Sequence, residues 1–205
     1  MIRRLALVAS VAALGFSTIG VEAAHAAAPI AGTGTVGTCT LTAKAKIKPG
    51  LVFGGVLTPV TTKFSGKLSG CAGGTGDGAN VTGGTVKGTI TSASPNDCLG
   101  LAVTGLAAFD VTIKWKTAPA TPKLLPTTTH IAPTPAANIV IGTWITITLT
   151  GTNDPAPTGS FASNAVTATA NTDETAATFA AACATPKGLK AFTFSGLNAP
   201  STITG

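Results

Sequence analysis

The chain has 205 residues, of which 44% are hydrophobic and 10% charged, with a formal net charge of +6. So many apolar and so few charged residues exclude an intrinsically disordered chain, because such a sequence would not stay solvated as a coil. The abundance of Thr, Ala, Val and Gly, with 13 Pro, also excludes a coiled coil or helical bundle and favours strands and turns.

The first 28 residues have the organisation of a secretory signal peptide. Arg3 and Arg4 precede an apolar run over residues 5–13, and small residues follow. We expect cleavage after Ala26 or Ala28. The general export route is favoured, since the residues after the paired arginines fit a twin-arginine signal only loosely. The run is too short for a transmembrane anchor, which needs about 20 apolar residues.

Removal of this segment changes the charge of the chain. Both arginines and Glu22 are lost, which leaves 11 lysines, six acidic residues and a net charge of +5. No later stretch approaches the roughly 18 apolar residues of a transmembrane helix. We therefore predict a signal peptide over residues 1–28 and a single secreted domain over residues 29–205.

Four cysteines lie in the mature chain: Cys39, Cys71, Cys98 and Cys183. An even number in an exported chain predicts two disulfides. Of the three connectivities that four cysteines allow, we favour Cys39–Cys71, which bounds a compact strand-turn-strand unit, with Cys98–Cys183, which ties the middle of the chain to its end. The alternative is a zinc site, but no C-x-x-C or H-x-x-x-H spacing exists. We expect neither a metal nor a cofactor.

Alternation of apolar and polar residues dominates the mature chain and predicts antiparallel strands with one solvated face. The expected strands lie at about residues 41–48, 63–68, 85–90, 111–116, 139–150, 159–170, 190–195 and 201–204. Gly-rich turns separate them, with a spacing typical of a sandwich or barrel. We predict an all-β fold with one short helix, specifically an antiparallel β-sandwich, immunoglobulin-like or similar, with two disulfides.

The short helix is expected at about residues 172–183. Asn171 is placed to cap its N-terminus, and Glu174 follows three residues later, as in a capping box. Asp173 and Glu174 would also face the positive end of the helix dipole. The sequence thus predicts that the helix begins directly after Asn171.

A Pro-rich stretch occupies residues 117–137 (TAPATPKLLPTTTHIAPTPAA). It is either a linker between two small domains or a long loop within one domain. A bridge between Cys98 and Cys183 would cross this stretch, and the length of the mature chain suits a single sandwich. One domain is the simpler interpretation.

Five short phrases are spread over the mature chain: FSGKLSGC at 64–71, KGTIT at 87–91, CLGL at 98–101, IKWK at 113–116 and CATPKG at 183–188. Together they resemble a family of uncharacterised, secreted, β-rich proteins of actinobacteria with four cysteines. The likeness covers most of the mature chain. It implies export, two disulfides and a β-rich domain, and it brings no activity and no catalytic residue.

Catalysis has little support in the sequence. His130 would have to be the base of a Ser-His-Asp arrangement, but it lies between prolines, where we expect a loop, and no G-x-S-x-G phrase supplies a nucleophile. The carboxylates available for glycoside hydrolysis are Asp77, Asp97, Asp110, Asp154, Asp173 and Glu174. Each of them has a local role in a turn, a strand edge or the helix start. We expect a protein that is not an enzyme.

Lysines recur on the polar side of the first four predicted strands. They are Lys44, Lys46, Lys48, Lys63, Lys67, Lys87, Lys114 and Lys116. If these strands share a sheet, the lysines form one basic face that could hold an anionic cell-wall polymer, an acidic glycan or an anionic lipid surface. The alternative is that lysine keeps sheet faces and edges soluble and unpaired. Nucleic acid is not expected, because the mature chain lacks Arg and aromatic residues do not interleave with the lysines.

The two tryptophans differ in their place in the alternation. Trp115 has the parity of Val111 and Ile113, which predicts a position in the core. Trp144 has the parity opposite to its isoleucine neighbours and could be exposed, in which case it could stack on a sugar ring. The alternative is a strand that is buried on both faces.

The sequence therefore predicts a secreted, non-catalytic binding or structural protein that associates with the cell envelope through its lysines. A carbohydrate-binding module that uses Trp144 is the alternative. An outer-membrane β-barrel pore also fits alternating strands behind a signal peptide, but such a barrel carries aromatic girdles and an apolar outer band. This chain has no Tyr, and its polar parity carries Lys. The identity of the ligand and the oligomeric state stay open.

Overall fold

The computed structural model describes residues 27–55, 58–92, 97–98, 105–197 and 200–205, so nearly all of the predicted signal peptide lies outside it. The strands are β1 (Gly37–Leu51), β2 (Val60–Gly73), β3 (Val81–Ser92), β4 (Phe109–Thr117), β5 (Thr127–Ile131), β6 (Ile139–Ile141), β7 (Trp144–Asn153), β8 (Ala165–Thr175), β9 (Leu189–Phe194) and β10 (Thr202–Thr204). The helical elements are α2 (Ala176–Cys183) and the short 3-10 helices η1 (Gly76–Asn80) and η2 (Ala136–Asn138).

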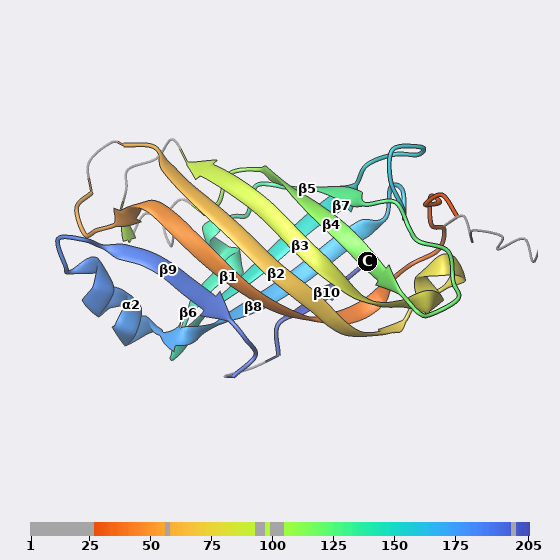
Figure 1. Ribbon diagram of the computed structural model, residues 1–205. Coiled ribbons are helices and arrows are strands. Elements are labelled where there is room, and N and C mark those ends of the chain that lie inside the picture. The colour runs from red at the N-terminus through yellow and green to blue at the C-terminus, as the bar shows by residue number, and fades with distance from the viewer. Residues whose placement is uncertain (1–26, 56–57, 93–96, 99–104, 198–199) are drawn as a thin grey trace, which may run out of the picture.

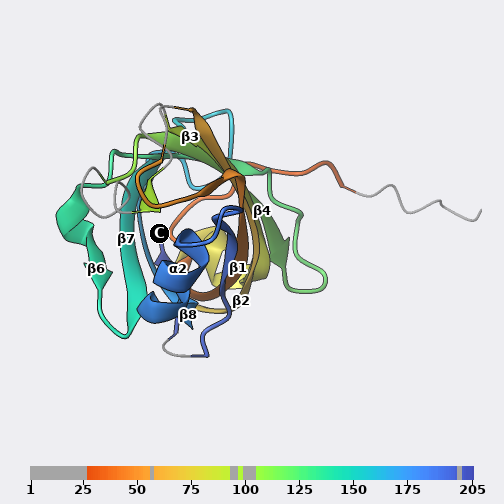
Figure 2. The same cartoon turned by 90° about the vertical axis from the view of Figure 1, so that its left-hand side faces the viewer.

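All ten strands belong to one antiparallel sheet, and this sheet closes on itself (Figure 1). Strands β1 to β5 follow one another in chain order, then come β7, β8 and β10, and β10 also pairs with β1. Strand β9 adds to β1, and β6 adds to β7. Viewed end-on, the strands surround a common interior, with α2 at one end (Figure 2). The predicted antiparallel β fold is confirmed, with opposite walls packed across a core as in a sandwich.

Both predicted disulfides are confirmed. Cys39–Cys71 links β1 to β2, and Cys98–Cys183 links the segment before β4 to the end of α2. The second bridge spans 85 residues of sequence, including the whole Pro-rich stretch. It therefore holds two distant parts of the chain at the same end of the closed sheet.

The alternation of residue types decides which side chains enter the interior. In β1, Leu41, Ala45 and Ile47 are buried, whereas Lys44 and Lys46 between them are exposed. The wall formed by β7, β8 and β10 carries threonines on its outer side instead, as in the cross-strand pairs Thr148 with Thr169 and Thr150 with Thr167. Threonine suits this position, because its branched side chain favours strands and its hydroxyl tolerates water. Some of the threonines of the chain thus form the polar outer side of this wall.

The core consists of two apolar clusters inside the closed sheet. One lies near α2 and includes Phe179, Phe192 and Phe194, whose rings contact one another. The other lies toward the opposite end and includes Phe161. The ring of Phe161 packs edge-on against that of Trp115, with 5.3 Å between the two ring centroids. Trp115 packs against this cluster, as its parity predicts, and its indole N–H donates to Thr127 Oγ1 at 2.7 Å.

The predicted start of the helix is wrong. The chain remains extended as far as Thr175, which caps α2 by accepting a hydrogen bond from the N–H of Thr178 at 3.1 Å. Asn171 is not the cap but a buried residue of β8 whose side chain accepts from Thr146 Oγ1 at 2.6 Å. Pairing of β8 with β7 continues past Asn171 as far as Thr175, opposite Trp144, and outweighs the local capping signal, because it satisfies backbone groups of the extended chain.

Asp173 and Glu174 consequently have other roles than at a helix start. Glu174 accepts from the N–H of Thr193 at 3.0 Å, and Asp173 accepts from the N–H of Ser195 at 2.9 Å. Both carboxylates therefore satisfy backbone donors of β9 and the residue that follows it. They bring β9 close to β8, where the two strands contact without a hydrogen-bonded ladder between their backbones.

The Pro-rich stretch is neither a linker nor a loop without structure. It contains β5, which pairs with β4 on one side and with β7 on the other. Thr127, Thr129 and Ile131 of this strand are buried, and the nearest prolines, Pro126 and Pro133, lie outside its ends. Proline lacks the N–H that a central strand needs, so the strand occupies the proline-free gap.

Two later strands also differ from the prediction. The strand expected over 139–150 is divided, because the chain reverses between β6 and β7 and these two pair with each other. The strand expected over 159–170 begins only at Ala165. Residues 159–161 before it are buried and cover one end of the interior.

Candidate anion-binding face

The eight lysines singled out from the sequence are all exposed and lie on the outer side of β1 to β4. Strand pairing brings several of them next to one another. Lys46 of β1 lies directly opposite Lys63 of β2, and Ser65 of β2 lies between Lys44 of β1 and Lys87 of β3. Neighbouring strands are about 4.8 Å apart, so these ammonium groups share one patch of surface.

Four of these lysines, Lys44, Lys46, Lys63 and Lys87, line a shallow hollow. The rest of its lining is Phe64, Ser65, Gly88, Thr89, Asp110 and Thr112. The other four lysines lie outside the hollow. On the neighbouring strands, threonines lie opposite three of them: Thr42 and Thr85 opposite Lys67, Thr85 opposite Lys114, and Thr61 opposite Lys48. The fourth, Lys116, lies opposite Gly83. The structure thus divides the predicted basic face into a hollow with four lysines and a surrounding rim.

No lysine of the hollow forms an ion pair with a residue that the structure describes. In the part of the chain that the structure describes, the ion pairs up to 4.0 Å are those of His130, and none involves a lysine. The facing pair of Lys46 and Lys63 is itself unfavourable, because like charges directly opposite each other on a sheet repel. An anion bound in the hollow would relieve this repulsion.

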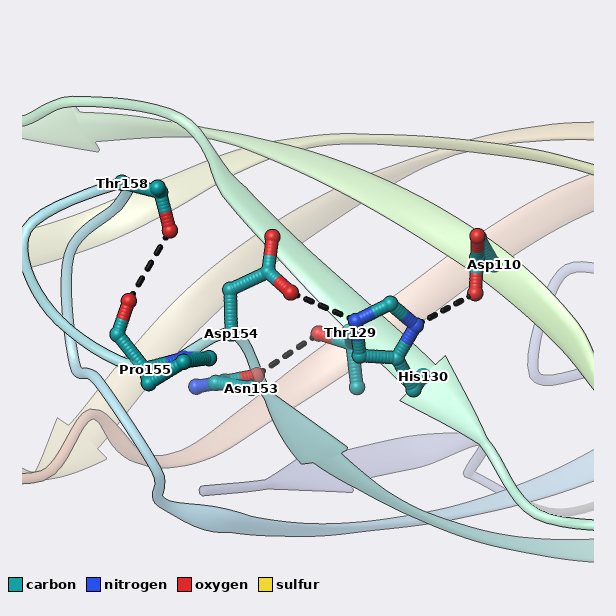
Figure 3. A network of polar contacts seen from close by, with 7 residues as sticks. All are labelled: Asp110, Thr129, His130, Asn153, Asp154, Pro155 and Thr158. Carbon is teal, nitrogen blue, oxygen red and sulfur yellow. Dashed lines mark hydrogen bonds and ion pairs between the residues drawn. The ribbon is translucent and has the colours of Figure 1, made fainter.

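A network of three ionisable side chains is drawn in Figure 3, and one of them, Asp110, belongs to the lining of the hollow. His130 of β5 lies opposite Asp110 of β4, and its Nδ1 is 2.6 Å from Asp110 Oδ1. Its Nε2 is 2.5 Å from Oδ1 of Asp154, the residue that follows β7. Asp110 is the one carboxylate in the lining of the hollow, and it is already engaged by His130.

Asp154 is held in place by its surroundings. Its N–H donates to the carbonyl of Thr128 at 2.9 Å. The preceding residue, Asn153, is buried, accepts from Thr129 Oγ1 at 2.7 Å and donates from Nδ2 to the carbonyl of Phe161 at 3.0 Å. A fixed loop therefore presents the Asp154 carboxylate to the imidazole ring.

Hydrogen bonding to Asp110, and next to Asp154, raises the pKa of His130 above its usual value of 6.5. The protonated ring donates from both nitrogens, and each carboxylate accepts. Protonation also changes the formal charge of the network from −2 to −1. The border of the hollow is therefore less negative when His130 is protonated.

The placement of His130 corrects the sequence-based expectation of a loop. The residue is the fourth of the five residues of β5, on the exposed side of the strand. Its partners are 20 and 24 residues away in sequence, so no local motif marks them. The one signal in the sequence is the alternation of apolar and polar residues along β4, which places the Asp110 side chain on the polar side of that strand.

The geometry does not prepare His130 to act as a base. Both ring nitrogens contact carboxylate oxygens, so neither is free to accept a proton from a serine or threonine hydroxyl. The residues that the structure describes also contain no group of three or more His, Cys, Asp or Glu side chains that could hold a metal ion. The network is thus arranged as an ion-pair bridge between three elements.

Trp144, the other residue singled out from the sequence, lies apart from the lysines. It begins β7, where its backbone is opposite Thr175, and its side chain is half-buried. The exposed apolar residues nearest in sequence are Val140 and Ile141 of β6. The structure therefore does not bring Trp144 and the basic hollow into one site.

Comparisons of this chain with protein-family models, with curated proteins and with solved structures found no match. Among the described residues, none of the helices has both the length and the apolar character to cross a membrane.

The His130 network should make stability depend on pH. Because folding raises the pKa of His130, its contribution to stability is complete below about pH 6.5 and is lost as pH rises through the raised value. We expect the midpoint of urea unfolding to fall between pH 6 and 8 more in the unmodified protein than in His130→Gln. Equal slopes for both would contradict this.

The pKa itself can be followed by NMR, since His130 is the one histidine after residue 28, where the predicted signal peptide ends. We expect Asp110→Asn to lower it more than Asp154→Asn, because the hydrogen bond to Asp110 has the larger effect. A pKa at 6.5 in the unmodified protein would show that the bridge is absent in solution.

Proposed function

We propose that the protein is exported and binds an anionic polymer of the cell envelope through its lysine-rich face, without catalysing a reaction. The observation that carries this proposal is the hollow on β1 to β4, where four lysines gather and none forms an ion pair with another described residue. Keeping like charges together costs stability, so an arrangement of this kind is best explained by a negatively charged partner.

The arrangement of the lysines favours a polymer with repeated charges over a single compact anion. Lys44 and Lys46 lie two residues apart along β1, roughly 7 Å, and Lys63 and Lys87 continue the patch across two further strands. Lysine is a flexible point charge, whereas arginine would give the fixed two-pronged geometry that selects one phosphate or carboxylate. A chain of phosphate or carboxylate groups, as in a teichoic acid or acidic glycan, fits such a surface.

Two further features support the location outside the cytoplasm. The N-terminal segment has the order of a signal peptide, and both disulfides of the chain are of the kind that persists in oxidising compartments. The occupied nitrogens of His130 support the non-catalytic part of the proposal.

Co-sedimentation with cell walls that carry teichoic acid, and titration with purified polyglycerol phosphate, would test this function. We expect binding that weakens steadily as salt rises, because screening shortens the reach of surface charges. Lys63→Gln with Lys87→Gln should weaken binding about thirtyfold at low salt, from about 1 kcal/mol for each lysine near an anionic surface.

The matched control is Lys123→Gln with Lys187→Gln, which removes the same charge from exposed positions outside the hollow. We expect this control to bind nearly as well as the unmodified protein. An equal loss in both double variants would show that net charge alone is responsible and would refute a specific face. Binding that resists salt and requires Trp144 would support the carbohydrate-binding alternative instead.

A further inference from the structure

The interior of the closed sheet contains an apolar cavity of about 140 Å³. It lies where the two core clusters meet, because its lining includes Ile47 and Phe192 from one cluster and Leu41 and Phe109 from the other. The lysine-lined hollow opens on the outer side of the same strands, and Phe64 is the residue that the two linings share.

Small side chains at inward positions account for the cavity. Ala43 and Ala45 of β1 and Ala170 of β8 all belong to the lining. The larger residues around them, among them Phe64 and Leu149, pack against both clusters and frame the space rather than fill it. Interiors are normally packed as densely as organic crystals, so a space of this size is a distinct feature.

The chemistry of the lining favours an apolar occupant over water. Among the lining residues that the structure describes, the polar side chains are Thr62 and Asp97, and the others are apolar or glycine. A buried water needs two to four polar partners, and a cavity lined by Leu, Ile and Phe stays dry. Asp97 lies beside Cys98, whose disulfide to Cys183 fixes this part of the lining.

We propose that this cavity is a binding site for a small apolar group, of the size of one aromatic ring or a short alkyl segment. The size follows from the volume, since an apolar cavity of about 150 Å³ holds benzene. The preference for hydrocarbon follows from the scarcity of hydrogen-bond partners. The inference does not depend on the proposed binding of anionic polymers, because the two sites use opposite faces of the sheet.

Titration of the oxidised protein with benzene, followed by NMR of the methyl groups, tests this directly. We expect saturable shifts at Ala43, Ala45 and Leu149. Phenol has nearly the same size but carries a hydroxyl, so it should bind at least tenfold more weakly. Absence of saturable shifts with benzene, or equal binding of phenol, would overturn the proposal.

Filling the space provides the second test. Ala170→Val adds two methyl groups inside the cavity and should weaken benzene binding at least tenfold. Ala168→Val is the matched control, since Ala168 is buried on the same face of β8 but is not part of the lining. Equal benzene binding by the two variants would place the ligand elsewhere and refute the site. Should Ala170→Val not fold, the comparison of benzene with phenol on the unmodified protein still decides.

Discussion

Replacing Cys98 and Cys183 together by alanine should lower the free energy of unfolding by about 4.6 kcal/mol at most, from the entropy of an open loop in the unfolded chain. The bridge closes a segment of 85 residues, which includes β4 to β8. Cys183 is buried at the end of α2, and the N–H of Cys98 donates to the carbonyl of Val52 at 3.2 Å. Loss of the bridge should therefore also loosen the end of the sheet that holds the apolar cavity.

The other disulfide provides the comparison. Cys39–Cys71 closes 32 residues between two strands that pair along most of their length. When Cys39 and Cys71 are both replaced by alanine, the same entropic argument gives a smaller loss in the free energy of unfolding, about 3.7 kcal/mol at most.

Urea unfolding of both double variants measures the difference between the two losses. The m-values should be equal, because unequal values would mean that the two unfolding transitions cannot be compared directly. A smaller loss for the Cys98 and Cys183 pair than for the Cys39 and Cys71 pair would contradict the prediction.

The sequence was sufficient to predict the strands of the lysine-rich face, because alternation depends only on which side of a strand faces water. Lys44 and Lys46 of β1, and Lys63 of β2, are exposed as their parity requires. Their arrangement as neighbours depends on register, and register is set by pairing between strands. The opposition of Lys46 and Lys63 could therefore not be derived from the sequence alone.

Features that depend on contacts far apart in sequence were missed or wrongly assigned. Closure of the sheet rests on β10, a strand that the alternation does predict, but its pairing with both β8 and β1 could not be derived from that alternation. The bridge from His130 to Asp110 and Asp154 joins β5 to β4 and to the residue after β7. The strand that contains His130 was not predicted, because prolines lie on both sides of it. The cavity arises from alanines that read as ordinary small strand residues. Each of these features exists only once the walls of the sheet face one another.

Phe161→Ala should lower the free energy of unfolding by about 3–5 kcal/mol, the usual cost of removing a buried aromatic ring. Phe161 is 1% exposed and packs edge-on against Trp115 at the end of the sheet opposite α2. Its N–H donates to the carbonyl of Gly32 at 2.7 Å, so the residue also fastens the segment before β1. Loss of the ring should leave a cavity that the surrounding backbone cannot easily close.

A comparison of alanine with glycine at this position separates the effect of packing from that of the backbone. Phe161 has φ of 57°, in the left-handed region, where a side chain costs about 1–2 kcal/mol that glycine avoids. At an ordinary strand position glycine is the less stable of the two. Here we expect Phe161→Gly to be at least as stable as Phe161→Ala, although it removes one more methyl group. Urea unfolding of the two variants decides the order, and a glycine variant that is clearly less stable would show that the backbone at residue 161 is not left-handed in solution.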